Sequence, residues 1–469
     1  MGELGDWDAV ETAARLRRGE VSARDVVEAA IRRAEAARAL GGLVTETFER
    51  ALERADAPVD RQAPFFGVPW ALKDLSNQAG VPTRWGSRGA SGRPAPASDA
   101  TIARFERLGF VSLGKSATPE LGLTATTEPL GFPPCRNPWD PSRTPGGSSG
   151  GSAVLVSAGV VPLAHAGDGG GSIRIPAACC GLVGLKPTRG RLDIEGSPLL
   201  PINLAAHGVV SRTVRDTIAF FTAVEATTPS ERPPITPVPP APPAPLRIGL
   251  STTSPAGTPV DDAQRRAVEQ AGRLCESLGH HVEPIASPID EAFPRDFFHF
   301  WSLLAVIQTR TIHLVARGRF DTSQWDPWTL HMAGRFRETS REVLAATLRL
   351  RAFGARFRRV FSRFDVVVMP TTAHAPPPLG HLAPTVPFET ARARLRQFVP
   401  FTSAFNASGC PALSLPLGRD ALGLPVGVQL GADLDGERSL LSLALTLEAA
   451  APWPRRAPLP EAVSGAPVG

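Results

Sequence analysis

The chain has 469 residues, of which 42% are hydrophobic and 20% are charged, and its formal net charge is +5. This balance is typical of a globular protein, and no apolar run reaches the roughly 18 residues that a membrane-spanning helix needs. The basic residues are scattered among acidic ones and are not interleaved with aromatic side chains, which argues against nucleic-acid binding.

The cysteines and histidines predict neither a disulfide framework nor a metal site. The five cysteines are odd in number and form no CxxC pair, and the nine histidines show no paired ligand spacing. We therefore expect no cofactor and no metal. The N-terminal residues lack the pattern of a secretory signal peptide, which together with the cysteine pattern favours a cytoplasmic protein.

Helical and strand-like patterns alternate along the chain. Residues 9–56 are expected to form two helices, with Ser22 as an N-cap. The apolar run 66–72 predicts a short strand that ends at Lys73. This alternation is typical of an α/β protein. The remaining expected elements are a helix over 99–108, strands over 110–113, 246–250, 364–370 and 424–430, and a closing helix over 437–451.

Two glycine clusters that contain serines lie near the middle of the chain, at residues 146–152 and 167–174. Glycine allows backbone conformations that other residues avoid, and it lets a ligand approach the backbone closely. A serine at the end of such a run has several backbone N–H groups around its hydroxyl, which is what an acyl-transfer site needs. The small, apolar segment 153–166 between the clusters predicts a buried helix that holds them together.

Lysine is nearly absent from the chain. Of the 50 basic residues only three are lysines, namely Lys73, Lys115 and Lys186. A retained lysine indicates a position where a guanidinium would fail, either because of its shape or because the group must lose its proton, which arginine cannot do. The alternative is that these lysines were retained by chance.

These motifs together resemble the amidase signature family. The resemblance is carried by both glycine clusters, by Lys73 in its strand-end motif, and by the segments 181–188 and 406–412. It implies an α/β fold over residues 1–469, in which one domain has a large mixed β-sheet core covered by helices on both faces. It also implies an amide (C–N bond) hydrolase that forms an acyl-enzyme. The sequence of the second cluster resembles that found in the subset of the family that includes 6-aminohexanoate cyclic-dimer hydrolase. The expected substrate is therefore a small amide, anilide, nylon-type oligomer or carbamate.

The resemblance assigns roles to residues of both clusters. In this family a lysine, a serine that follows a cis peptide bond and a nucleophilic serine form the catalytic triad, and they correspond here to Lys73, Ser148 and Ser172. A buried lysine can be neutral near pH 7, so Ser148 can relay the proton of Ser172 to it. The expected oxyanion hole consists of the backbone N–H groups of Gly169, Gly170, Gly171 and Ser172. The expected supporting residues are Ser149, as a hydrogen-bond partner, and Asp168 with Arg174, as an ion pair that braces the loop.

The same resemblance bears on two longer segments. The proline-rich segment 229–245 is expected to be a stiff surface linker within the single domain, because motifs on both sides of it belong to one fold. Residues from about 285 to 395 are expected to form the variable, substrate-facing region. Nine of the 30 aromatic residues fall within 293–336. Trp301, Trp325 and Trp328 are therefore expected to line the substrate pocket, with packing between helices as the alternative.

Other nucleophile and ligand sites remain open alternatives. Residues 146–150 also fit the GxSxG elbow of α/β-hydrolases, with His374 and His381 as catalytic candidates, although such an elbow should follow a strand. The second cluster resembles a phosphate-binding loop, but it lacks the GxxxxGK spacing.

A different class of protein is also considered, a subunit of a tRNA-dependent amidotransferase that acts with partner subunits. That subunit typically carries a glutamine where this chain has Ile175 and a tyrosine where it has Arg189. We therefore expect a small-molecule amide as the partner, with neither nucleic acid nor membrane, and a homodimer is left open.

Overall fold

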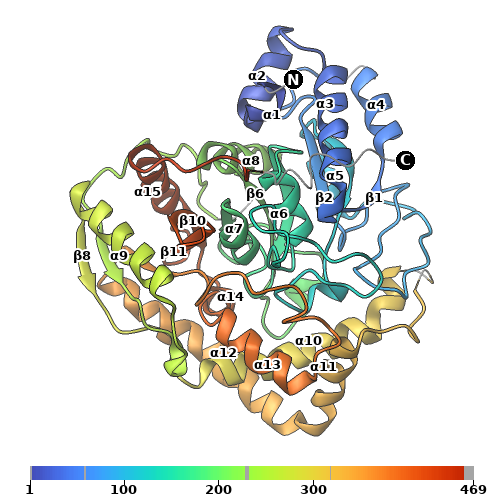
Figure 1. Ribbon diagram of the computed structural model, residues 1–469. Helices are drawn as coiled ribbons and strands as arrows, with labels where there is room; N and C mark the ends of the chain where they lie inside the picture. The colour runs from blue at the N-terminus through green and yellow to red at the C-terminus, as the bar shows by residue number, and fades with distance from the viewer. Residues whose placement is uncertain (1–2, 58–59, 228–231, 317, 319, 459–469) are drawn as a thin grey trace.

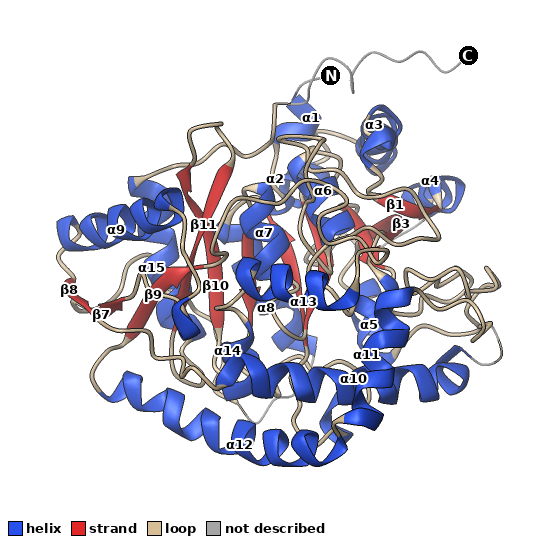
Figure 2. Cartoon of the chain, turned by 60° about the horizontal axis from the view of Figure 1, so that its bottom comes forward, coloured by secondary structure: helices blue, strands red, loops and turns tan. Residues whose placement is uncertain are grey.

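A mixed sheet of eight strands runs through the computed structural model, which describes residues 3–57, 60–227, 232–316, 318 and 320–458 (Figures 1 and 2). Its strands are β4 (Leu163–Asp168), β5 (Val183–Lys186), β6 (Ala206–Ser211), β7 (Arg247–Leu250), β8 (His281–Pro284), β9 (Val366–Pro370), β10 (Ala412–Arg419) and β11 (Pro425–Gly431). Their order is β4-β6-β5-β10-β11-β9-β7-β8. β7 is parallel to β8 and β9, and the other neighbours are antiparallel.

Helices cover both faces of this sheet, which confirms the expected α/β architecture (Figure 2). In β9, Val366 and Val368 pack into a core with α8 (Val214–Thr227), α9 (Asp262–Ser277) and α15 (Glu437–Ala450). Val367 and Met369 pack into another core with α10 (Phe293–Ala316), α12 (Ser340–Arg358) and α14 (Ser403–Ser408). Successive side chains of a strand point to opposite faces, so a strand that is apolar throughout must be buried on both.

A small three-stranded sheet, in the order β1-β3-β2, places Lys73. It consists of β1 (Leu43–Glu46), β2 (Pro69–Lys73) and β3 (Val111–Ser116), so the expected strand that ends at Lys73 is confirmed. The backbone N–H of Lys73 donates to His165 Nδ1 in β4 at 3.2 Å. The end of β2 is thereby tied to the edge strand of the large sheet.

Most of the other expected elements are also present. Ser22 caps α3 (Ala23–Ala36) with a complete capping box, and the helix expected over 99–108 is α5 (Ala100–Glu106). The expected strands over 246–250, 364–370 and 424–430 are β7, β9 and β11, and the closing helix is α15. The remaining helices are α1 (Glu3–Asp6), α2 (Ala9–Arg18), α4 (Phe48–Asp56), α6 (Gly150–Ser157), α7 (Arg174–Cys180), α11 (Pro327–Glu338) and α13 (Phe388–Phe398).

Two predictions of secondary structure were wrong. The segment 153–166 is not one helix, because α6 ends at Ser157 and β4 begins at Leu163. Gly159 has a φ of 74°, and Pro162 follows it, so the helix cannot continue. Residues 9–56 form three α-helices, a short 3₁₀ helix (Arg38–Leu40) and the strand β1 rather than two helices.

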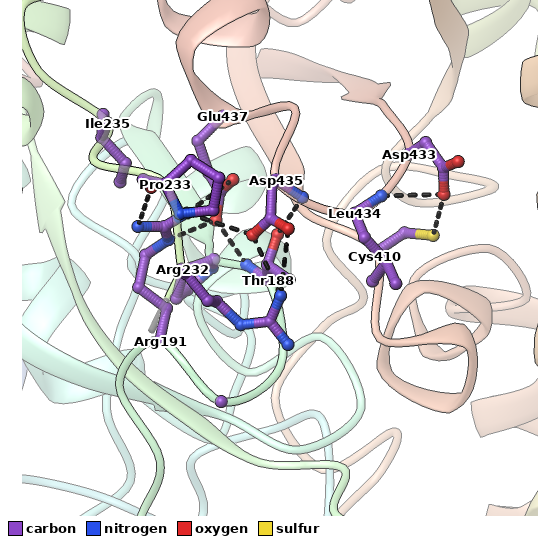
Figure 3. Close-up of polar contacts among 12 residues, drawn as sticks. Thr188, Arg191, Arg232, Pro233, Ile235, Cys410, Asp433, Leu434, Asp435 and Glu437 are labelled. Atoms are coloured by element: carbon purple, nitrogen blue, oxygen red, sulfur yellow. Dashed lines mark hydrogen bonds and ion pairs between the residues drawn. The ribbon is translucent and has the colours of Figure 1, made fainter. Parts of the chain in front are cut away.

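The proline-rich segment is anchored to the rest of the molecule from Arg232 onward, while residues 229–231 of the predicted linker lie outside the described residues. The buried Arg191 donates to the carbonyl oxygen of Pro233 at 3.0 Å and also pairs with the carboxylates drawn beside it in Figure 3. Ile235 is only 1% exposed and belongs to the core of the large sheet. Among the described helices, none is both long and apolar enough to cross a membrane.

Candidate active site

Lys73 is buried at the end of β2 and contacts Ser148. It is 2% exposed, and its Nζ donates hydrogen bonds to Ser148 Oγ at 2.8 Å and to the carbonyl oxygen of Gly167 at 3.2 Å. Burial lowers the pKa of Lys73 to about 7, against the opposing effect of the Asp168 carboxylate. This lysine can therefore lose its proton near neutral pH. Lys115 and Lys186 are buried as well.

Ser148 lies in the loop that leads into α6. The Gly147–Ser148 peptide bond is cis, as the resemblance implies. A Cβ at Gly147 would lie 2.6 Å from the carbonyl oxygen of Thr126, so only glycine fits there. The preceding strand, β3, ends at Ser116, far from this serine in the sequence. The strand that a GxSxG nucleophile elbow requires is therefore missing from this part of the described chain.

Ser172 lies in the loop that joins β4 to α7, and a buried ion pair holds this loop. The Asp168 carboxylate at the end of β4 meets the Arg174 guanidinium at 3.0 Å, and both residues are 0% exposed. Asp168 also accepts the N–H groups of Gly171 at 2.7 Å and Ile173 at 3.2 Å. Burial alone would raise the pKa of Asp168, but the charge and hydrogen bonds of Arg174 lower it well below its usual range. The loop is thus wrapped around an ionised carboxylate.

The expected set of oxyanion donors is only partly available. The N–H of Gly171 is already bonded to Asp168, so it is not free to bind a ligand. Gly171 has a φ of 130°, and a Cβ there would lie 2.3 Å from Thr402 Oγ1. The N–H groups of Gly169, Gly170 and Ser172 donate to no acceptor within the described part of the chain.

Ser149 connects the loop of Ser148 to the loop of Ser172. Its Oγ lies 3.3 Å from both the backbone nitrogen and the carbonyl oxygen of Gly167. Its own N–H donates to the carbonyl oxygen of Ser172 at 3.3 Å. The two glycine clusters therefore share a common hydrogen-bonded frame.

A chain of hydrogen bonds that the sequence did not reveal runs away from Lys73. His165 Nδ1 accepts the N–H of Lys73, His165 Nε2 lies 2.9 Å from His207 Nδ1, and His207 Nε2 lies 3.2 Å from the Glu195 carboxylate. Since His165 Nδ1 accepts, its proton sits on Nε2, and the same reasoning puts the proton of His207 on Nε2. Burial, reinforced by His207 and then Lys73, lowers the pKa of His165 well below its usual value. His165 is therefore uncharged, and its hydrogen bond to the N–H of Lys73 holds the end of β2 in place.

Two cavities meet at Ser172. The inner cavity has a volume of about 360 Å³ and is lined by Lys73, Ser148 and Ser172. The outer cavity has a volume of about 320 Å³ and is lined by Gly170 and Ser172, but not by Lys73 or Ser148. The inner cavity also contains the apolar side chains of Leu75, Trp85, Leu121, Leu200, Leu204, Leu304, Ile307 and Ile312, and the outer cavity contains Phe297, Phe298, His299, Arg295, Arg335, Arg392 and Arg396.

Trp301 is the one of the three predicted tryptophans that lines these cavities, and it lines both. It stacks on Phe297 with ring centroids 5.5 Å apart. The two rings cover the glycine loop closely, because a Cβ at Gly169 would come within 3.2 Å of Trp301 and one at Gly170 within 3.3 Å of Phe297. The glycines leave room for this aromatic wall.

Trp325 and Trp328 do not line either cavity, so the pocket prediction was wrong for them. They are 8% and 7% exposed and pack in a hydrophobic cluster with Trp85 and Leu123, which is the core alternative. The histidines of the α/β-hydrolase interpretation, His374 and His381, are also absent from the lining of both cavities. The described residues contain no group of three or more histidine, cysteine or acidic side chains placed to hold a metal ion.

Comparison with known proteins gives a consistent result. A family model described as Amidase matches residues 25–441. The chain is 43% identical over 457 residues to the putative amidase AmiC of Mycobacterium tuberculosis strain H37Rv, covering 96% of both chains. It is 34% identical over 488 residues to the 6-aminohexanoate-cyclic-dimer hydrolase of Paenarthrobacter ureafaciens, covering 98% of both. The solved structure of a 6-aminohexanoate cyclic dimer hydrolase complexed with substrate superposes with a TM-score of 0.88 at 31% identity, covering 99% of this chain and 100% of that one.

Proposed function

The chain belongs to the amidase family and is an amide hydrolase, and we propose that it cleaves small amides or anilides through an acyl-enzyme formed on Ser172. Carbamates and nylon-type oligomers fall within the same proposed substrate class. Lys73 is the proposed base, and Ser148 is the proposed proton relay between the lysine and the nucleophile.

The proposed reaction has two halves. In the first, neutral Lys73 takes the proton of Ser148 while Ser148 takes that of Ser172, and Ser172 Oγ attacks the carbonyl carbon. The N–H groups of Gly169 and Gly170, with that of Ser172, are the proposed donors to the resulting oxyanion. The C–N bond then breaks, and the proton returns through Ser148 to the leaving nitrogen. In the second half, water attacks the acyl ester by the same relay, and a carboxylic acid and free Ser172 result.

The hydrogen bond from Lys73 to Ser148 carries this proposal. A lysine with its ordinary pKa of 10.5 would be protonated at pH 7 and could not accept a proton. Here burial lowers the pKa of Lys73 to about 7, its Nζ is 2.8 Å from Ser148 Oγ, and both line the cavity that contains Ser172. A hydrogen bond between the hydroxyls of Ser148 and Ser172 is the contact that the proposal adds, and such contacts often tighten only when substrate binds.

The proposal is tested by assaying the pure chain on a chromogenic anilide with an uncharged acyl group. Ser172→Ala should abolish turnover, and Ser148→Ala should lower kcat/KM by about a thousandfold or more. Ser277→Ala, at the exposed end of α9, is the matched control and should behave like the wild type. A folded Ser172→Ala variant that retains more than about one hundredth of the wild-type rate would contradict the proposal. A requirement for partner subunits would instead favour the amidotransferase interpretation.

A further inference from the structure

The outer cavity has a strongly cationic lining. Four arginines contribute to it, and no aspartate or glutamate is among the described residues that line it. The arginines come from three separate elements, which only the fold brings together. They are Arg295 in α10, Arg335 in α11, and Arg392 and Arg396 in α13.

The carboxylates that pair with these arginines leave positive charge in excess. Arg335 and Arg392 share the exposed Glu389, at 3.1 Å and 2.5 Å. Arg295 lies 3.5 Å from Asp296, but that carboxylate is already bound by Arg349 at 2.6 Å and 2.7 Å. Arg396 forms no ion pair with any residue that the structure describes. An anion that entered this cavity would therefore find guanidinium groups that are not neutralised.

The wall of the outer cavity also contains hydrogen-bonding capacity that is not used. Arg335 Nε and His299 Nδ1 are buried and have no hydrogen-bond partner among the described residues. Neither atom is reached by solvent, so neither can bond a ligand in the cavity without a movement of its side chain. The guanidinium groups of Arg335 and Arg392 both contact the ring of Phe298, at 6.0 Å and 5.4 Å from its centroid. These contacts hold both arginines at the cavity.

The position of Ser148 assigns the two halves of the substrate to the two cavities. In the proposed reaction Ser148 returns the proton to the leaving nitrogen, and Ser148 lines the inner cavity only. The amine half must therefore lie in the inner cavity. Leucine and isoleucine make up much of its lining, which also includes the polar side chains of Glu195 and Gln308. Ser172 lines both cavities, so the acyl half extends from it into the outer cavity.

We propose that the outer cavity binds a carboxylate carried by the acyl half of the substrate, so that the preferred substrates are monoamides of dicarboxylic acids with an apolar amine. This inference rests on the proposed function and narrows its substrate class. A carboxylate matches the planar, two-pronged geometry of a guanidinium, and charge-assisted bonds of this kind are strong. Hydrolysis breaks the C–N bond of such a monoamide with one water and releases the dicarboxylic acid and the free amine.

Three nitroanilides that differ only at the far end of the acyl chain test this inference. The probes are the glutaryl anilide, which ends in a carboxylate, the hexanoyl anilide, which ends in a methyl group, and the ω-aminopentanoyl anilide, which ends in an ammonium group. The carboxylate probe should exceed the methyl probe in kcat/KM by about tenfold to a hundredfold, the size of a charge-assisted hydrogen bond. The ammonium probe should be the poorest of the three.

Variants of the arginines provide the second arm of the test. Arg392→Gln and Arg396→Gln should each lower the ratio of kcat/KM between the carboxylate and methyl probes. Arg396→Glu should shift the preference toward the ammonium probe, a gain that a misfolded variant could not show. Arg359→Gln removes an exposed charge outside the cavity and is the matched control, which should leave the ratio unchanged.

Two outcomes would overturn the inference. One is equal kcat/KM on all three probes, and the other is a higher kcat/KM on the methyl or ammonium probe than on the carboxylate probe. In both cases Ser172-dependent hydrolysis of the hexanoyl anilide would leave the proposed function standing. Loss of the proposed function would instead appear as hydrolysis of that neutral probe by Ser172→Ala.

Discussion

The amine of Lys73 should make the folded chain less stable at neutral and acidic pH than a variant that lacks it. Burial lowers the pKa of Lys73 from its ordinary value of 10.5 to about 7. Between these two values the unfolded chain binds a proton that the folded chain does not, so the free energy of unfolding rises with pH across this window. Below pH 7 the folded chain holds a charge in an apolar site, and above about pH 10.5 this penalty is gone.

Lys73→Met removes the amine and keeps most of the side-chain volume. The fall from 10.5 to about 7 corresponds to a penalty of about 5 kcal/mol at low pH, at roughly 1.4 kcal/mol per unit. The variant also loses the two hydrogen bonds from Nζ to Ser148 and Gly167, at about 1 kcal/mol each. We therefore expect Lys73→Met to raise the free energy of unfolding by about 3 kcal/mol at pH 6, and to lose this gain as the pH approaches 10.5.

Urea denaturation at pH 6 and at pH 9.5 or so measures this effect directly. Lys186→Met is the matched control, because Lys186 is also 2% exposed, burial lowers its pKa to about 7, and it lies outside the proposed triad. Both variants should be stabilised at pH 6, but only Lys73→Met should lose turnover. A Lys73→Met protein that is less stable than the wild type at pH 6 would refute the reasoning, because the lysine would then be a favourable structural cation.

Four further predictions follow from the same contacts. In a pH–rate profile, kcat/KM should fall below about pH 7, because Lys73 then gains its proton. The Lys73→Arg variant should lose about a hundredfold or more in kcat/KM, since arginine keeps its proton, and retention of a tenth of the wild-type kcat/KM would exclude the base role. Asp168→Asn leaves Arg174 buried without its counter-charge and should lower the free energy of unfolding, measured by urea denaturation, by about 3–5 kcal/mol. A loss under about 1 kcal/mol would show that the ion pair contributes little to stability. His207→Phe leaves the Nε2–H of His165 without an acceptor, so steady-state kinetics should show a lower kcat with KM little changed. An unaltered kcat would show that His207 does not help to position Lys73. Gly171→Ala should abolish activity, because the new Cβ would collide with Thr402; an active variant would show that the loop can relax.

The parts of the site that depend on local sequence were predictable. Lys73 ends an apolar strand, and Ser148 and Ser172 lie in two glycine clusters. In these clusters Gly146 and Gly171 have positive φ values, and a Cβ at Gly147 would collide with the backbone of Thr126. The scarcity of lysine in an arginine-rich chain marked three positions, and all three proved to be buried. The error over 153–166 arose because a small, apolar run fits a helix and a buried strand equally well. Gly159 and Pro162 were the signals that could have separated the two.

The parts that depend on tertiary contacts were not predictable. No sequence signal shows that the Asp168 carboxylate accepts a hydrogen bond from the N–H of Gly171, because this contact depends on how the loop folds around the carboxylate. Counting aromatic residues could not separate Trp301, which faces both cavities, from Trp328, which packs in the core. The cationic wall of the outer cavity combines α10, α11 and α13, and the histidine chain joins β4 to β6, so each needs the fold before it can be seen.

Trapping the acyl-enzyme tests directly whether Ser172 is the nucleophile and Lys73 its base. The wild-type chain is mixed with a slowly hydrolysed aryl ester or carbamate, quenched with acid, digested and mapped by mass spectrometry. We expect the acyl group on Ser172 and no label on the Ser172→Ala variant. The label should accumulate far more slowly in Lys73→Arg than in Lys186→Met. Covalent label on any other residue, or equally fast labelling of Ser172 in Lys73→Arg, would contradict these assignments.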